Sequence, residues 1–363
     1  MIRKLLCLTA IFVFSVEASA ISSGRYAIVN MYSAKALEVE ASSADNGANV
    51  VQWAYWGGAN QLWDVTDLGN GYHSIRAAHT GKSLDAWGWD STPGAEVRQY
   101  DYWGGDTQQW GINSTGNYFV ISNKYTGLSL DIWGWDWDNG GDVRQWSATG
   151  LDNQKWSFVK LEGRGSACNS TGSSSITSTV YVDGYTFDGG CRTYNPSSAL
   201  GTGDQDESQD PAFRVQNGGV LTNAILGNNG VDGVHVYNGG NVHNFTWSNV
   251  GEDALTIKSS GNVFVRNFEG YDGSDKFFQV NAASNLYASE CIVNNMGKFL
   301  RQNGGTTFQV NVEVNNCAIS NMSEGIFRTD SSSSTAVITN STLNNSGSTC
   351  IGSWASCSAS NNN

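Results

Sequence analysis

Four short segments decide the fold of this chain, and in order they are Val231-Asp-Gly-Val-His-Val236, Glu252-Asp-Ala-Leu-Thr-Ile257, Asp275-Lys-Phe-Phe-Gln-Val280 and Gly297-Lys-Phe-Leu-Arg-Gln302. Aligning their apolar alternations brings four charged residues into one column: Asp232, Asp253, Lys276 and Lys298. The steps down this column are 21, 23 and 22 residues. A repeat of this length is typical of one turn of a solenoid, so the stretch predicts a coil.

The column joins two carboxylates to two ammonium groups. In a parallel β-solenoid, equivalent residues of neighbouring turns lie about 4.8 Å apart, which is the spacing of paired strands. Glu252 would lie beside the acidic end and Arg301 beside the basic end. Such a surface can hold a cation together with an anionic substrate, so we predict a binding site here. Two other basic residues, Lys258 and Arg266, are expected to be ordinary solvated side chains.

Short apolar strands recur from Val220 to beyond Phe308, and each precedes one of the column segments or its continuation. Every turn should therefore carry at least two strands. Asn223, Asn244 and Asn267 fall in or just after successive strands, where stacked side-chain amides would satisfy the backbone of turns. The pattern favours a right-handed parallel β-helix over a sandwich, whose strands would be joined by hairpin turns.

The first half of the chain repeats three times, with a period of 46–47 residues. The units end in Gln61-Leu-Trp63, Gln108-Gln-Trp110 and Gln154-Lys-Trp156. Three equal units of short strands predict pseudo-threefold packing around a shared core, in which these Gln and Trp side chains are buried. The three Gln-x-Trp motifs resemble those of the ricin-type β-trefoil lectins. The whole chain is therefore expected to be all-β.

The lectin resemblance implies a sugar site built from an acid, an aromatic ring and an asparagine. In repeats three, two and one, these positions hold Asp131, Trp146 and Asn153; Asp85, Tyr100 and Thr107; and Glu38, Trp53 and Asn60. A carboxylate beside an aromatic face suits the hydroxyls and the apolar face of a sugar ring. We expect the third site to bind, keep the second as a candidate and do not expect the first to bind. The Trp-Gly-Trp motifs nearby are expected to pack within hairpins.

Residues 1–20 are interpreted as a signal peptide, because Arg3 and Lys4 precede an apolar run and Ala18-Ser-Ala20 supplies a cleavage site. No later apolar stretch is long enough for a membrane span. The formal net charge of −13 disfavours nucleic acid as a partner. We predict a secreted monomer that binds neither nucleic acid nor a membrane.

Six cysteines follow the signal segment, and an even number in a secreted chain suggests disulfides. Proximity favours Cys350–Cys357, and the separation of Cys291 and Cys317 would suit neighbouring coils. The expected organisation is a trefoil over residues 21–160, a flexible Gly/Ser linker over 161–178 and a β-helix over 179–363.

Six motifs of the second half occur in one order: Asp188-Gly-Gly190, Asp206-Glu-Ser-Gln-Asp-Pro-Ala-Phe213, Asp232-Gly-Val-His235, Val250-Gly-Glu-Asp-Ala-Leu-Thr-Ile-Lys258, Asp275-Lys-Phe-Phe-Gln279 and Gly297-Lys-Phe-Leu-Arg301. Over about residues 179–330 this order resembles the class III pectate lyases, polysaccharide lyase family 3. The resemblance implies calcium-dependent β-elimination of polygalacturonate, the backbone of pectin. It implies these site residues: Asp232, Glu252 and Asp253 for Ca²⁺, Lys276 as catalytic base, and Lys298 and Arg301 as its basic companions. The chain departs from the family at Asn249, where an Asp is usual.

The chemistry of such a reaction agrees with these residue types. β-Elimination removes the weakly acidic C5 proton of a uronate, and a hard cation on the C6 carboxylate stabilises the enolate-like intermediate. Carboxylate oxygens are the ligands that Ca²⁺ prefers. We expect desolvation and the neighbouring cations to lower the pKa of Lys276 from about 10.4, so that it can accept the proton. Arg301 is the alternative base.

Two other functions are compatible with the sequence. The chain would be a secreted carbohydrate-binding protein if its coil were inactive. A polygalacturonase also has a β-helix, but it needs paired Asp residues, and only Asp253 lies at the relevant place. An eliminase produces an unsaturated uronide that absorbs in the ultraviolet, a hydrolase produces reducing ends without it, and a lectin produces neither.

Overall fold

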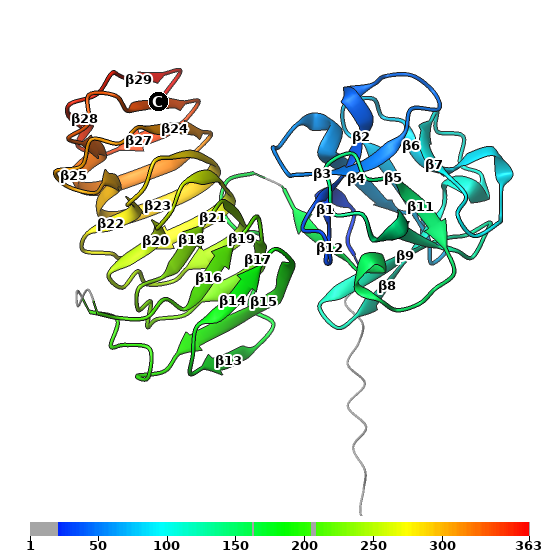
Figure 1. Ribbon diagram of the computed structural model, residues 1–363, viewed down its shortest axis with the longest axis horizontal. Coiled ribbons are helices and arrows are strands. Elements are labelled where there is room, and N and C mark those ends of the chain that lie inside the picture. The colour runs from blue at the N-terminus through cyan, green and yellow to red at the C-terminus, as the bar shows by residue number, and fades with distance from the viewer. Residues whose placement is uncertain (1–20, 162, 205–207, 363) are drawn as a thin grey trace, which may run out of the picture.

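The computed structural model describes residues 21–161, 163–204 and 208–362, and places two β bodies side by side (Figure 1). The expected signal peptide lies outside the described residues, as do Asp206 and Glu207 of the second motif. Among the described residues, no helix has the length and apolar character needed to cross a membrane.

The first body is an antiparallel arrangement of 12 strands. The strands are β1 (Gly24–Asn30), β2 (Ala36–Val39), β3 (Val50–Trp53), β4 (Leu62–Asp67), β5 (His73–Ala77), β6 (Ser83–Ala86), β7 (Val97–Tyr100), β8 (Trp110–Thr115), β9 (Tyr118–Asn123), β10 (Ser129–Ile132), β11 (Val143–Trp146) and β12 (Trp156–Lys160). Short 3₁₀ turns, two in each repeat, are η1 (Glu40–Ser42), η2 (Ala59–Gln61), η3 (Trp87–Trp89), η4 (Asp106–Gln108), η5 (Trp133–Trp135) and η6 (Asp152–Gln154). Strand β1 pairs with both β4 and β12, which joins the first unit to the last. The predicted trefoil is confirmed.

The Gln-x-Trp motifs form the core of this body, as predicted. The side chains of Trp63, Trp110 and Trp156 are fully buried. In each repeat, the indole Nε1 atom donates a hydrogen bond to a backbone carbonyl of the strand pair that precedes the motif. These bonds measure 2.9, 3.0 and 3.2 Å in the three repeats. Because each tryptophan is both buried and hydrogen-bonded, the motif fixes the fold whether or not a repeat binds sugar.

The second body is a 17-stranded parallel coil. Its strands are β13 (Ser173–Ile176), β14 (Val180–Asp183), β15 (Thr186–Pro196), β16 (Phe213–Gln216), β17 (Val220–Leu226), β18 (Val234–Tyr237), β19 (Gly240–Trp247), β20 (Asp253–Ile257), β21 (Gly261–Tyr271), β22 (Lys276–Val280), β23 (Ser284–Gln302), β24 (Val310–Asn315), β25 (Ala318–Thr329), β26 (Thr335–Thr339), β27 (Thr342–Asn344), β28 (Ser348–Gly352) and β29 (Ser356–Ser360). Strands pair in parallel with the equivalent strand of the neighbouring turn, so the predicted parallel β-helix is confirmed.

Buried aliphatic and aromatic side chains fill the coil. Phe277 lies parallel to Phe299 of the next turn, with ring centroids 6.1 Å apart. At one corner Asn244 donates a side-chain hydrogen bond of 2.8 Å to Asn223, as the amide ladder predicted. Asn267 instead donates to the carbonyl of Gly163. Aligned residues on successive turns thus pair with each other, which fixes the register of the coil.

Three disulfides fasten the coil, and the two pairings suggested by spacing are confirmed: Cys350–Cys357 and Cys291–Cys317. The third, Cys168–Cys191, lies in the segment that was expected to be a flexible linker. That segment is fastened to the coil elsewhere too. Arg164 donates hydrogen bonds to two coil side chains at 2.8 Å, and β13 pairs with β15. Its Gly/Ser composition therefore serves close backbone pairing and not freedom of movement.

The trefoil packs directly on the coil. Val220 of β17 is fully buried in an apolar cluster with the trefoil residues Val29 and Val159. Tyr118 Oη donates a hydrogen bond of 2.7 Å to the backbone carbonyl of Thr186. The two bodies thus share a small apolar core and a set of hydrogen bonds.

Arg266 belongs to this junction, although it was expected to be solvated. Its Nη2 donates a hydrogen bond of 3.0 Å to the carbonyl of Trp56 in the trefoil. Its guanidinium also lies over the ring of Tyr55, 5.1 Å from the centroid. The contact could not be found from the sequence because 210 residues separate the donor from its acceptor.

Asp188 is the buried carboxyl at the junction. It accepts hydrogen bonds from Ser157 of the trefoil, from Asn223 at 2.8 Å and from the backbone of Gly190 at 2.9 Å. Burial raises the pKa of Asp188 to about 6, although these three hydrogen bonds oppose the shift. Since an Asp in the unfolded chain has a pKa of about 3.9, the folded protein holds this proton more tightly.

The stability contributed by this proton is complete below pH ~4 and is lost as the pH rises through 6, an effect of about 3 kcal/mol. We therefore expect Asp188→Asn to flatten the fall in melting temperature between pH 4 and 7, measured by circular dichroism. Asp45→Asn, at an exposed carboxylate, is the matched control and should leave the slope unchanged. An unaltered slope in Asp188→Asn would contradict this account.

Candidate active site

The predicted column exists as a register of paired strands. Asp253 pairs with Lys276, and Lys276 pairs with Lys298. Asp232 precedes Val234 by two residues, as Asp253 precedes Leu255, and these two apolar residues pair. The turn that carries Asp232 depends on Gly233, whose φ of +50° suits glycine. A Cβ on Gly233 would lie only 2.2 Å from the carbonyl oxygen of Ala254 on the next turn.

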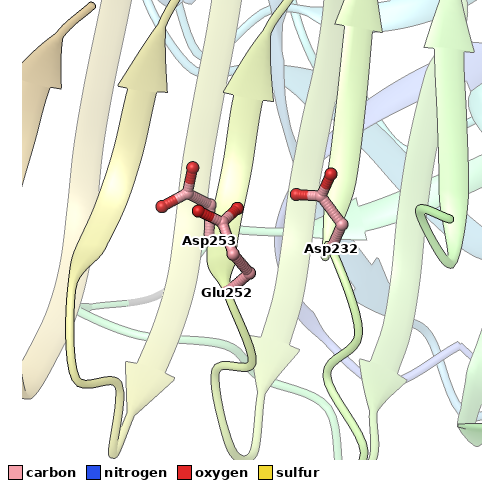
Figure 2. A group of neighbouring side chains, drawn as sticks. All are labelled: Asp232, Glu252 and Asp253. Atoms are coloured by element: carbon pink, nitrogen blue, oxygen red, sulfur yellow. The ribbon is translucent and has the colours of Figure 1, made fainter. Parts of the chain in front are cut away.

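Three carboxylates gather at the acidic end of the column. Asp232, Glu252 and Asp253 are all buried, and one oxygen of each lies within 4.8 Å of the others. Figure 2 shows that Asp232 comes from one turn and the other two from the next. His235 Nε2 lies 2.8 Å from Asp232 Oδ2, and Thr256 Oγ1 lies 3.4 Å from Asp253 Oδ2.

This cluster fits a hard cation. Asp232 Oδ1 and Asp253 Oδ1 are buried and accept no hydrogen bond within the described part of the chain. Burial raises the pKa of Asp253 to about 9; the charge of Lys276 opposes the shift, while the charges of Glu252 and Asp232 add to it. A buried set of carboxylates, in which Asp232 Oδ1 accepts no hydrogen bond among the described residues, offers the oxygen ligands that a calcium ion prefers.

Lys276 joins the acidic end of the column to the basic end. Its Nζ lies 2.6 Å from Asp275 Oδ2, 3.4 Å from Asp253 Oδ1 and 3.5 Å from Glu252 Oε1. Burial acts to lower the pKa of Lys276, but the charge of Asp253 and the bond and charge of Asp275 outweigh it, so the pKa is raised. This differs from the lowered pKa expected from the neighbouring cations, because the carboxylates lie nearer.

The other two basic residues are also held by carboxylates. Lys298 Nζ lies 2.8 Å from Asp275 Oδ1 and 2.6 Å from Glu324 Oε1. Arg301 Nη2 lies 2.9 Å from Asp330 Oδ2, whereas its Nη1 has no hydrogen-bond partner among the described residues. Asp275 therefore bridges Lys276 and Lys298 and fixes their positions relative to each other.

One hollow of about 420 Å³ collects these groups. Five of the six residues predicted for the site line it: Glu252, Asp253, Lys276, Lys298 and Arg301. Asp232 does not line the hollow, but it belongs to the buried carboxylate cluster. Lys258, expected to be solvated, also lines the hollow, with its Nζ 3.9 Å from Asp232 Oδ2.

Sequence reasoning missed three of the supporting side chains: His235, Glu324 and Asp330. His235 was visible in the Asp232-Gly-Val-His motif and lies on Asp232. Glu324 belongs to the turn after the last aligned segment, since Lys298 pairs with Gly325. Extending the column by one more turn would have found it.

The third trefoil repeat carries a separate hollow of about 340 Å³. Asp131, Asn153 and Trp146 all line it, as predicted for a sugar site. Asp131 Oδ2 accepts hydrogen bonds from Gln154 at 2.8 Å and from Asn153 at 3.0 Å, while its Oδ1 accepts none among the described residues. Trp133 and Trp135 also line the hollow, and they pack against Trp146 and Tyr32 respectively.

In the other two repeats the acid is also bound to the motif glutamine. Asp85 accepts from Gln108 at 2.7 Å. Glu38 accepts from Gln61 at 2.8 Å and also from the indole of Trp56 at 3.2 Å. Both bonds to Glu38 go to its Oε2. Tyr100 of the second repeat is exposed, as a stacking ring would need to be.

Comparison with known sequences assigns the coil. The profile of the family described as "Pectate lyase" matches residues 164–360, more than half of the chain. The chain belongs to this family. A second profile, "Ricin-type beta-trefoil lectin domain-like", matches residues 11–100 and 94–146. The pectate lyase match begins within the segment 161–178, which agrees with the fastening of that segment to the coil.

Individual relatives align with a shorter part of the chain than the pectate lyase profile does. Pectate lyase H of Emericella nidulans is 40% identical over 67 residues, which are 18% of this chain and 26% of the relative. Probable pectate lyase E of Aspergillus clavatus is 39% identical over a stretch of the same length. The matches thus span about a quarter of either relative. Among solved structures, the designed threefold protein ThreeFoil is 43% identical, covering 38% of this chain and 99% of its own, with a TM-score of 0.38.

Proposed function

We propose that the protein is a secreted, calcium-dependent pectate lyase that cleaves de-esterified polygalacturonate by β-elimination and uses its trefoil to bind cell-wall carbohydrate. The observation that carries the proposal is the column in which three buried carboxylates meet Lys276, Lys298 and Arg301 beside one hollow. A lyase needs a cation and a base on the same uronate, and the column brings both types of group together.

Asp232, Glu252 and Asp253 would hold the calcium ion. Their burial within 4.8 Å of one another supports this assignment, as does Asp232 Oδ1, which accepts no hydrogen bond among the described residues. When bound, Ca²⁺ would draw electron density from the substrate carboxylate and so make the C5 proton easier to remove. The fourth acid, Asp275, is already engaged by two ammonium groups and is assigned to positioning.

Lys276 is proposed as the proton acceptor. Its Nζ takes the C5 proton, the C5–H electron pair forms the C4–C5 double bond, and the C4–O bond breaks with its electrons on the leaving oxygen. Lys298 and Arg301 would bind uronate carboxylates, and Arg301 Nη1 has a donor to spare. Because the acidic neighbours raise the pKa of Lys276, kcat/KM should rise with pH until the amine is neutral.

Ultraviolet absorbance tests the reaction class directly. The protein is incubated with polygalacturonate from neutral to alkaline pH, with added calcium or with excess chelator. We expect an unsaturated product with calcium and none with chelator. Reducing ends without absorbance would indicate a hydrolase, and retention on the polymer without either product would indicate a binding protein only.

The third trefoil hollow is proposed as the carbohydrate site of this module, because it combines a carboxylate oxygen free of hydrogen bonds with exposed indole rings. We expect Trp146→Ala to weaken binding to isolated plant cell wall by roughly 10-fold or more, since a stacked ring contributes on the order of 1–3 kcal/mol. Cleavage of soluble polygalacturonate should be unchanged.

Trp53→Ala, at the equivalent exposed ring of the first repeat, is the matched control for pull-down on wall material. Equal losses of binding in both variants would show that any exposed aromatic ring contributes, and not the third-repeat hollow in particular.

The proposal of secretion is supported by the three disulfides, since such bonds persist in oxidising compartments.

A further inference from the structure

A second cavity lies where the trefoil meets the coil. It has a volume of about 420 Å³, and its walls come from both bodies. The trefoil contributes Lys35, Trp137 and Asp138 to these walls. The coil contributes the turn before β19, Asn241 of β19 and Phe264 of β21. Neither the column nor the third-repeat sugar site includes any of these residues.

Trp137 breaks the threefold repeat of the trefoil. Two residues after η5 the chain has Trp137, whereas the equivalent positions after η1 and η3 hold Ala44 and Ser91. The ring packs edge-to-face against Tyr32, with centroids 4.8 Å apart, yet it remains 42% exposed. Its edge faces the coil, since a Cβ on Gly184 would lie 3.2 Å from the indole. The ring thus lies in the wall between the two bodies, where a ligand in the cavity can reach it.

Lys35 supplies the positive charge of the cavity. Its ammonium lies over the Trp137 ring, 5.5 Å from the centroid, and it has no ion-pair or hydrogen-bond partner among the described residues. Burial lowers the pKa of Lys35, while the charges of Asp138 and Asp136 oppose the shift. The equivalent lysine of the second repeat, Lys82, is instead paired with Asp101. A partly buried ammonium without a fixed partner is suited to an anionic group of a ligand.

Asn241 supplies an amide that the fold does not use. It is 8% exposed, yet its side chain makes no hydrogen bond within the described residues and lies in the cavity wall. An amide without a protein partner in the wall of a cavity is available to a ligand or water there. Asp138, an exposed carboxylate of the same wall, can accept hydrogen bonds from hydroxyl groups.

We propose that this junction cavity is a second carbohydrate-binding site, which takes an acidic pyranose such as a galacturonosyl residue. The uronate carboxylate would bind Lys35, the apolar face of the ring would lie against Trp137, and the hydroxyls would bond to Asn241 and Asp138. A uronosyl unit has all three features, whereas a neutral hexose leaves the ammonium unpaired. The site needs both bodies, which gives their fixed contact a function.

Protection of Lys35 from acylation tests the proposal in the full-length Lys276→Ala protein, in which the probe should remain uncut. The protein is treated with a small amine-acylating reagent, and modification of each lysine is followed by peptide mass spectrometry. Trigalacturonate should slow the labelling of Lys35 in a saturable way and leave Lys82 unaffected. Galactotriose, the neutral counterpart, should protect at least 10-fold less well, the loss expected for one charge-assisted hydrogen bond.

Asn241→Ala removes no side-chain hydrogen bond to any described residue, so it should melt at the same temperature as its parent. It should raise the trigalacturonate concentration needed for half-protection by several-fold. Absent protection, equal protection by both trisaccharides, or an unchanged concentration in Asn241→Ala would each overturn the proposal. The readout is occupancy at Lys35, so it does not depend on whether the column cleaves polygalacturonate.

Discussion

Replacing Lys276 by alanine should lower kcat on polygalacturonate by about 10²- to 10⁴-fold, the contribution typical of a general base. Lys276→Arg should be badly impaired too, because a guanidinium gives up its proton far less readily than an ammonium. Both variants should still bind substrate, since the loss concerns the transition state only. Initial rates from ultraviolet absorbance at saturating calcium, across neutral to alkaline pH, measure the effect.

Arg301→Lys is the decisive comparison. The substitution keeps a positive charge next to Asp330 but removes the guanidinium, whose Nη1 has no hydrogen-bond partner among the described residues. We expect a higher KM and a smaller loss in kcat than in Lys276→Ala. If Arg301→Lys is inactive while Lys276→Ala retains substantial turnover, then Arg301 is the base and Lys276 only places charge.

Calcium should raise the melting temperature of the protein markedly, and Asp253→Asn should remove most of that gain. Three buried carboxylates lie together, so without the ion the charged form of Asp253 is disfavoured by burial and by its two acidic neighbours. A ligand at 100 times its Kd stabilises by about 2.7 kcal/mol, or ~5–10 °C for a body of this size. Asp253→Asn removes one ligand charge, so it should need far more calcium for the same shift.

The same substitution should stabilise the chelated protein. The pKa of Asp253 is raised to about 9, so its proton stabilises the fold fully below pH ~4, and this contribution is lost as the pH rises through 9. In chelator at pH 8, Asp253→Asn should therefore melt above the parent, while Asp45→Asn should not. If Asp253→Asn melts below the parent, both in chelator, then the charged form of Asp253 does not destabilise the fold as argued.

Much of the site could be predicted because a solenoid converts sequence period into spatial contact. Once Leu255 was aligned with Phe278, the pairing of Asp253 with Lys276 followed from the register. The Gln-x-Trp repeat predicted the trefoil for a similar reason, since each tryptophan lies in the core. In both bodies the informative residues recur at one position of a repeat.

Contacts outside a repeat could not be predicted in this way. The raised pKa of Lys276 depends on how close Asp275 and Asp253 approach, and sequence spacing does not give ångström distances. The junction depends on pairs such as Arg266 and Trp56, which no periodicity relates. The segment after the trefoil was expected to be flexible from its composition, yet the disulfide through Cys168 ties it down.

The shared core around Val220 has a consequence for how an immobilised polymer would be cut. A module on a loose tether lets its enzyme cleave anywhere within reach, so the products vary widely in length. Here the trefoil packs directly on the coil, so the separation between the sugar hollow of the third repeat and the hollow beside Lys276 varies less than it would on a tether. A polymer chain bound in the third-repeat hollow would then reach the hollow beside Lys276 at a nearly constant distance along its length. Digestion of anchored pectin should then release fragments of a preferred size, whereas digestion in solution should not.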